Sequence, residues 1–456
     1  MKQQMPKILK YFLLIGAALA VLLFTALIAT FCGLRQFTRG NVARAHTLFR
    51  LATPISWTAS RLSFRSVETL EVWYALNLLF TQGGKYLVLL QNSDEIRATG
   101  GFIGSYAVLD LDSAEPLRLE IRDMYDPSGI SQTLPSPPGQ AEYLSEGRGM
   151  KLIDANWNPD FPTSAKQILQ YFAVIPDDPQ TFTGVIALPL TTIESLINSL
   201  GGVYLVDQQQ MINGDDLATV IRQDREQFFA GSKEKAQSLQ ALYTALKLSL
   251  NQLSLIESWQ LWQSMQQAKF WQEIQVFAQT AKLQNALDSA QLTGALMNYQ
   301  PQDVFVFPVE SNVGINKANR KVSRHLTARL KDQQLILTTK FQNDFTKTER
   351  PVLSADSDYA VAPHLAYVNY YRLLTRPDMK VEQIKINGEP VATWDDTEIT
   401  SAAGLVYRQI GFLVVVLEQK QTEVQIEFSV PVISKPRLII PRQVGLRYTS
   451  ITDSIE

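Results

Sequence analysis

The densest group of chemically versatile side chains lies in one glycine-rich stretch, residues 92–105. It contains Asp94, Glu95 and Arg97 and connects two segments with the residue pattern of strands. α/β folds bind ligands at the carboxyl ends of their strands, and glycines expose backbone N–H groups to anions. The stretch therefore predicts an anion-binding turn. A tight hairpin whose charges face water fits the same residues equally well.

Two further pairs of residues could complete such a site. Arg122 and Asp123 end another strand-like segment, and Arg222 and Arg225 lie three residues apart, which places them on one face of a predicted helix. Two guanidinium groups on one face can each hold two oxygens of a pyrophosphate. Taken alone, the arginine pair is more typical of a solvated helix surface paired with its acidic neighbours.

An uncharged apolar run, residues 11–34, precedes all of these groups. At about 1.5 Å rise per residue its helix is longer than the roughly 30 Å hydrocarbon core of a bilayer. The run is too long for a cleaved signal peptide, and Phe31 before Cys32 disfavours lipid attachment. Because lysines precede the run and no acidic residue does, we expect a single-pass anchor with a cytoplasmic N-terminus and an extracytoplasmic bulk.

Composition excludes several classes of function. The chain carries 42 basic and 44 acidic residues without a basic block, so nucleic acid is not an expected partner. Its three histidines are scattered, and its single cysteine lies in the apolar run. Neither an intrachain disulfide nor a zinc site of Cys and His ligands is therefore expected.

The remaining pattern predicts an α/β fold with a C-terminal β-sandwich. We expect a cytoplasmic tail and transmembrane helix over residues 1–34 and a helical stalk or packing helix over 35–82. A mixed α/β domain with a long helical segment should follow over 83–300, including a right-handed crossover between strands near 182–188 and 203–206. Alternating strands predict a sandwich-like domain over 301–456.

Four motifs in this order resemble the bacterial domain-of-unknown-function family 4012. They are LLQNSDEIRATGGFIGSY, NWNPDFPTSA from Asn156, GVIALPLTTIESLINSLGGV from Gly184 and VESNVGINKANRKVSR from Val309. The resemblance extends from about residue 85 to residue 343. Members of that family typically have an N-terminal transmembrane helix, and the function of the family is not established.

The order of elements is also similar, more weakly, to that of the LytR-CpsA-Psr phosphotransferases. Those membrane-anchored enzymes transfer a glycopolymer from a polyprenyl-pyrophosphate carrier to the cell wall. The catalytic residues that this similarity implies are Asp94, Asp123 and Arg122, with Mg²⁺ held by the two aspartates. Arg222 and Arg225 would match phosphate-binding arginines of those enzymes, and Arg97, at the same predicted strand end as Asp94, is the third candidate substrate-binding residue.

The chain departs from the phosphotransferase pattern after its arginine pair. Lys233 and Lys235 stand where those enzymes carry further arginines, and lysine cannot bind two oxygens in a bidentate fashion. Two hypotheses follow. The chain is an extracytoplasmic cell-envelope protein that binds or transfers polyprenyl-pyrophosphate-linked glycan, with the membrane and the lipid-linked glycan or cell wall as partners. Alternatively, it is a non-enzymatic surface adhesin or envelope scaffold.

Overall fold

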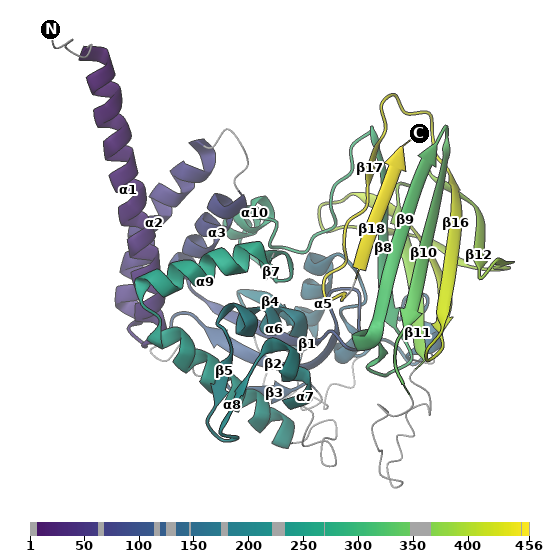
Figure 1. The fold of residues 1–456 in the computed structure, drawn as a ribbon, viewed down its shortest axis with the longest axis horizontal. Coiled ribbons are helices and arrows are strands. Elements are labelled where there is room, and N and C mark those ends of the chain that lie inside the picture. Colours follow the sequence, from purple (N-terminus) through teal and green to yellow (C-terminus); the bar gives the residue numbers. More distant parts are fainter. Residues whose placement is uncertain are drawn as a thin grey trace.

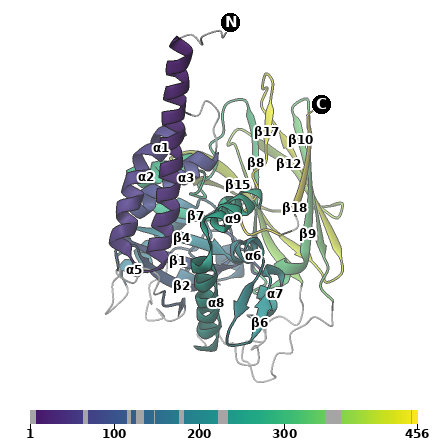
Figure 2. The same ribbon diagram turned by 60° about the vertical axis from the view of Figure 1, so that its left-hand side comes forward.

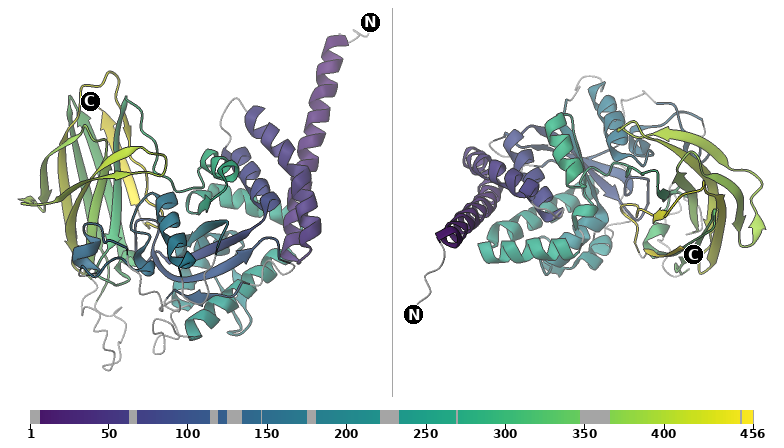
Figure 3. Two further views of the ribbon diagram at one scale, coloured as in Figure 1. Left: turned by 180° about the vertical axis from the view of Figure 1, so that it is seen from behind. Right: turned by 90° about the horizontal axis from the view of Figure 1, so that it is seen from above.

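The chain forms a helical N-terminal region, a mixed sheet between helices and a C-terminal β-sandwich (Figure 1). The sandwich and helix α1 lie at opposite ends of the molecule (Figure 3). The computed structural model describes residues 7–62, 68–113, 119–124, 134–145, 147–174, 181–220, 233–268, 270–346, 366–447 and 449–455.

Three helices open the chain: α1 (Lys7–Thr38), α2 (Val42–Leu62) and α3 (Glu68–Gln82). Among the described residues, α1 is the one helix that is long and apolar enough to cross a membrane, and its apolar segment is Ala20–Thr38. Its N-terminal part extends beyond the rest of the fold (Figure 2). The C-terminal half of α1 packs against α2 and α3, where the indole N–H of Trp73 donates to the Thr30 hydroxyl at 2.8 Å. Residues 35–82 are therefore largely packing helices and do not form an extended stalk.

The central sheet has the strand order β3-β2-β1-β4-β7. In this sheet β1 pairs in antiparallel fashion with β2 and in parallel fashion with β4. The bounds of its strands are β1 Lys85–Asn92, β2 Phe102–Asp110, β3 Arg122–Asp123, β4 Gly184–Pro189 and β7 Gln275–Ala278. The carboxyl ends of β1, β3 and β4 therefore meet at one edge of the sheet, which is the edge where the sequence places its candidate site.

The expected crossover between neighbouring strands near residues 182–206 is wrong. After α6 (Leu190–Ser199), β5 (Val203–Leu205) leaves the sheet and forms a two-stranded hairpin with β6 (Gln210–Ile212). The cause is the turn at Gly201 and Gly202, whose φ angles of 75° and 110° redirect the chain. The parallel partner of β4 is β1, and the connection between them includes α4 (Gln140–Tyr143) and α5 (Phe161–Ala173).

Helices cover both faces of the central sheet. On one face, α5 packs against β1 and β4 in a cluster that includes Leu87, Ile168 and Phe172. On the other face, Ala75 and Leu283 belong to a cluster with strand residues. The remaining helices are α7 Gly214–Val220, α8 Lys233–Gln252, α9 Leu255–Gln267 and α10 Ala281–Ser289. Three short 3₁₀ helices lie at Leu152–Asp154, Phe270–Gln272 and Ala318–Lys321.

The C-terminal part is a two-sheet sandwich, as predicted, with strand orders β13-β12-β16-β10-β9-β18 and β14-β15-β11-β8-β17. Side chains alternate between the buried core and solvent along β9 and β10, and Phe341 and Tyr371 meet edge to face across the sheets. The strands of the first sheet are β9 Val322–Lys331, β10 Gln334–Asn343, β12 Lys380–Ile386, β13 Glu389–Pro390, β16 Gln421–Ser429 and β18 Thr449–Ile455. Those of the second are β8 Asp303–Asn312, β11 Tyr367–Thr375, β14 Asp395–Thr400, β15 Val406–Val416 and β17 Arg437–Ile439.

Candidate functional site at the seam between the sheet and the sandwich

The glycine-rich turn after β1 is buried, and its charged side chains do not face solvent. Asp94 and Arg97 are 0% and 1% exposed. Gly101 has a φ of 152°, and a Cβ atom there would lie 2.4 Å from the carbonyl group of Asn92. The glycine is therefore required for close approach of two backbone segments. The turn lies between the central sheet and the sandwich, and we call this contact region the seam.

Arg97 contacts two carboxylates from the region of the central sheet and one backbone carbonyl of the sandwich. Its guanidinium group lies 3.0 Å from a carboxylate oxygen of Glu95 and 3.6 Å from one of Asp154. It also donates to the backbone carbonyl of Asn312 in β8 at 2.5 Å. Burial raises the pKa of both Glu95 and Asp154, and the nearby Arg97 charge opposes this rise. The positive charge of Arg97, which the sequence predicted to bind substrate, is thus compensated within the seam.

The carboxylate of Asp94 pairs with an arginine near the C-terminus. Arg447 lies 3.4 Å from a carboxylate oxygen of Asp94 and grips both oxygens of Glu194, in α6, at 2.5 and 2.7 Å. The side chains of Asp94, Glu194 and Arg447 are 1%, 10% and 16% exposed. A bidentate arginine between two buried carboxylates fixes the position of the C-terminal segment. We call residues 442–447 the clasp.

The other residues of the clasp fasten the same edge of the sheet. Arg442 pairs with Glu273, which also accepts the backbone N–H of Gly445 at 2.9 Å. The side-chain amide of Gln443 donates to the carbonyls of Arg97 at 3.0 Å and Glu310 at 2.9 Å. The clasp therefore links the sandwich strand β8 to the turn after β1.

A buried hydrogen-bond network inside the sandwich also holds the turn after β1. Arg324 forms two hydrogen bonds with Glu310, and Tyr367 donates to the same carboxylate. Asn319 accepts from Arg324 and donates to the backbone carbonyl of Ser93 in the turn after β1 at 2.5 Å. The carboxylate and the phenol beside it hold the pKa of Arg324 above its usual range, against the effect of burial. The turn is thus fixed from both of its sides.

The segment from Asn156 is fastened to the sandwich sheet that contains β8 and β11. Arg372 in β11 donates to the carbonyl of Trp157 at 3.0 Å and to the Ser311 hydroxyl at 2.9 Å, and its guanidinium group lies 4.6 Å from the Trp157 ring centre. Burial lowers the pKa of Arg372 to about 10. Asp160 caps α5 and also accepts the backbone N–H of Ala402 at 2.9 Å. Three motif segments, near residues 94, 157 and 311, therefore meet in one contact region.

The predicted residues on β3 lie apart from the clasp. Asp123 is buried and pairs in register with Ser105 of β2. The Arg122 side chain is 40% exposed and lies 2.8 Å from Glu120, and that hydrogen bond raises the arginine pKa. Arg222 and Arg225 lie outside the described residues. The structure thus brings Asp94 and Arg97 together in the seam and leaves Arg122 partly accessible on β3, the outermost strand of the sheet.

The magnesium site stays a prediction. Strand β2 lies between β1, which Asp94 follows, and β3, which carries Asp123. Two strand spacings amount to about 10 Å, so a shared ion would need both side chains to reach across β2. In the described part of the chain, no group of three or more His, Cys, Asp or Glu side chains is arranged to hold a metal ion.

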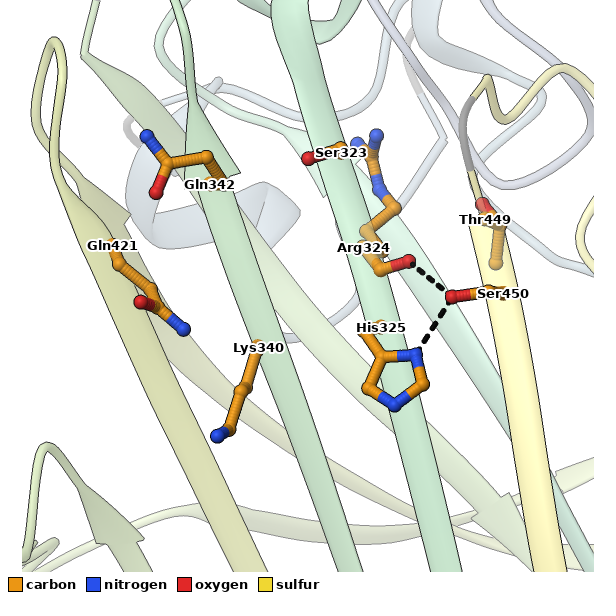
Figure 4. Close-up of a pocket in the computed structure, with 8 residues that line it drawn as sticks. All are labelled: Ser323, Arg324, His325, Lys340, Gln342, Gln421, Thr449 and Ser450. Carbon is orange, nitrogen blue, oxygen red and sulfur yellow. Dashed lines mark hydrogen bonds between the residues drawn. The ribbon is translucent and has the colours of Figure 1, made fainter.

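An open groove of about 500 Å³ lies on the outer face of the sandwich and was not predicted from the sequence (Figure 4). The imidazole Nδ1 of His325 lies 2.7 Å from the Ser450 hydroxyl, which bridges β9 and β18. Amide and ammonium groups come from the neighbouring strands β10 and β16. The lining residues are Ser323, Arg324, His325, Lys340, Gln342, Gln421, Thr449 and Ser450. The groove offers many hydrogen-bonding groups to a hydroxyl-rich ligand.

Several solved structures and one family profile are similar to the chain, whereas no curated protein matches it. The Lin1025 protein from Listeria innocua is 13% identical, with 50% of this chain and 85% of that chain covered at a TM-score of 0.26. TagV from B. subtilis is 12% identical, with 46% and 81% covered at a TM-score of 0.27. Both are LytR-CpsA-Psr family proteins.

The family profile agrees with the resemblance seen in the motifs. The matching family is described as "Protein of unknown function (DUF4012)" and covers residues 82–225. That range includes the turn after β1, the pair Arg122 and Asp123, and the pair Arg222 and Arg225, and it ends before the sandwich begins. The extension of the resemblance to residue 343 stays a prediction. Residues 82–225 of the chain therefore match the DUF4012 family model.

Proposed function

We propose that this protein is a membrane-anchored scaffold of the cell envelope, in which the DUF4012 region holds the sandwich in a fixed position relative to α1. The observation that carries the proposal is the seam. Asp94 and Arg97 are buried, and their charges are compensated by Arg447, Glu95 and Asp154. Buried charge pairs hold the elements that supply them in one relative position, because separating the pair would leave a buried charge uncompensated.

In this proposal the sandwich presents the polar groove to a hydroxyl-rich envelope polymer. Gln342 of β10 lies opposite Gln421 of β16, and Lys340 lies 3.3 Å from Glu423 in the next cross-strand pair, so the two pairs form one row of donors and acceptors (Figure 4). Sugar hydroxyl groups both donate and accept hydrogen bonds, and they match such a row. The anchor would confine the groove to the membrane surface, which raises its effective concentration at a polymer located there.

The experiment compares a groove variant with a matched variant of the sheet edge. The groove variant carries Lys340→Ala, Gln342→Ala and Gln421→Ala in the full chain, and the second variant carries Arg122→Ala. We expect the groove variant to lose binding to isolated envelope polysaccharide at least tenfold, and the Arg122 variant to bind like the wild type. Equal binding of the groove variant and the wild type, with both folded, would refute the assignment of the groove.

A second function rests on the exposed side chain of Arg122. It lies beside Asp123 at the carboxyl edge of the sheet, where α/β folds place their ligands. There it could hold a phosphate oxygen of a polyprenyl-pyrophosphate-linked glycan, with Mg²⁺ on Asp123. Phosphate release from such a lipid by the wild type, lost in Arg122→Ala and retained in the groove variant, would favour transfer chemistry over the scaffold.

A further inference from the structure

Helix α1 has two different surroundings along its length. Near the middle of the helix, Val21 and Phe24 are 64% and 66% exposed, as expected for side chains that face lipid. From Ala26 onward one side of the helix is buried, with Ala26 and Ala29 at 1% and 8% exposure. The segment that is apolar enough to cross a membrane is therefore also part of the folded helical region.

Helix α2 brings further residues to the same level as this segment. A short turn separates α1 from α2, and the two helices lie side by side over much of their length (Figures 1 and 2). At about 1.5 Å per residue, α2 returns roughly 30 Å along α1. Ala52 and Ile55 of α2 belong to the same cluster as Ala26 and Ala29. The C-terminal half of α2 thus lies beside the apolar part of α1.

The exposed side of α2 has the composition of a helix at a membrane interface. Leu51 and Trp57 are 60% and 48% exposed, and no charged residue lies between Arg50 and Arg61. All charged residues of α2 are arginines, and the helix has no acidic residue. Tryptophan and arginine are enriched where hydrocarbon meets phosphate groups, because each has an apolar body and a polar end.

The hydroxyl groups of this half-helix are bonded within α2 itself. The hydroxyls of Thr53, Ser56, Thr58 and Ser60 donate to backbone carbonyls three or four residues earlier, at 2.7, 3.0, 2.8 and 2.9 Å. Hydroxyls bonded in this way need no water and are tolerated in an apolar environment. Thr25 in the exposed part of α1 does the same, donating to Val21 at 2.8 Å.

We infer that the C-terminal half of α2 is a second lipid contact of this protein, with Leu51 and Trp57 among the acyl chains and Arg50, nearer the start of α2, at the lipid phosphates. The inference rests on the proposed anchoring by α1. The occupant is the phospholipid bilayer itself, because this surface continues the exposed apolar surface of α1 and carries only positive charge. A half-embedded α2 holds the folded region against the membrane, so this region has little freedom to rotate relative to the bilayer.

The test measures lipid exposure at single positions in the full chain, reconstituted in phospholipid nanodiscs. With Cys32→Ser as background, a nitroxide is attached at Val21→Cys, Trp57→Cys or Val432→Cys. Val432 is 81% exposed on the sandwich and is the water-facing control. We expect positions 21 and 57 to be more accessible to oxygen than to a water-soluble nickel chelate, and position 432 to show the reverse.

The three positions distinguish anchoring by α1 from the lipid contact of α2. If position 21 faces lipid while position 57 is as accessible to nickel as position 432, the contact through α2 is refuted and the anchor is retained. If position 21 faces water, the anchor itself is refuted, and the contact through α2 with it. A second measurement uses no spin label. Brominated lipids should quench the tryptophan fluorescence of the wild type more than that of Trp57→Phe. They should quench Trp394→Phe as much as the wild type. Equal quenching of the wild type and Trp57→Phe would also refute the lipid contact.

Discussion

Arg447→Ala removes the cation of the clasp that joins two buried carboxylates. The guanidinium group of Arg447 grips Glu194 at 2.5 and 2.7 Å and lies 3.4 Å from Asp94, and all three side chains are mostly shielded from water. Removing one partner of a buried ion pair costs about 3–5 kcal/mol, since the remaining charges are left uncompensated. Arg447→Lys keeps the charge and loses the bidentate geometry, so we expect a loss of about 1–2 kcal/mol.

The matched control is Arg122→Ala, which breaks a pair whose side chains are 40% and 74% exposed. Exposed pairs contribute about 0–1 kcal/mol. Stability is measured by urea unfolding of the full chain in detergent micelles. Hydrogen exchange locates the effect, and we expect faster exchange in residues 92–102 and 442–447 of the Arg447→Ala protein. Equal stability of Arg447→Ala and Arg122→Ala, with unchanged exchange in both segments, would refute the structural role of the clasp.

Three further predictions concern a turn, an ion pair and a helix contact. Gly101→Ala should destabilise the protein by about 3 kcal/mol or more, because its Cβ would meet the backbone of Asn92, whereas Gly147→Ala, with open space around it, should cost about 1–2 kcal/mol; circular dichroism melts compare the two. The hydrogen bond from Arg437 lowers the pKa of Asp303, so stability should be lost as pH falls through that lowered value, and Asp303→Asn should remove this pH dependence from urea titrations. Thr30→Val should cost about 2 kcal/mol by leaving the Trp73 indole N–H unpaired, whereas Thr25→Val, which loses only a bond within α1, should have little effect on the melting temperature.

Local patterns predicted the sandwich and the apolar helix because both follow from neighbouring residues. Alternation along β9 and β10 places every second side chain in the core, and this period is visible without knowledge of the partner strand. The uncharged run in α1 is visible in the same way. The crossover prediction failed because the order of strand, helix and strand does not reveal whether the second strand, here β5, returns to the sheet.

The seam could not be predicted, because its partners are far apart in the sequence. Asp94 and Arg447 are separated by 353 residues, and Glu194 and Arg447 by 253. An acidic residue in a glycine-rich turn looks the same whether its partner is a metal ion, a phosphate or a distant arginine. Charge compensation within the chain is a property of the folded protein, and the spacing of the turn contains no signal of it.

The burial of the turn changes which substitutions can test for enzymatic chemistry. A variant at Asp94 or Arg97 would lose function under either hypothesis, since Asp94 pairs with Arg447 and Arg97 donates to the Asn312 carbonyl in β8, and both contacts join the sheet to the sandwich. Arg122 is different, because its side chain is partly exposed and its partners, Glu120 and Tyr106, both lie outside the seam. Loss of function in Arg122→Ala with unchanged stability would therefore point to chemistry at the sheet edge, whereas loss confined to the variants at Asp94 and Arg97 would point to the seam.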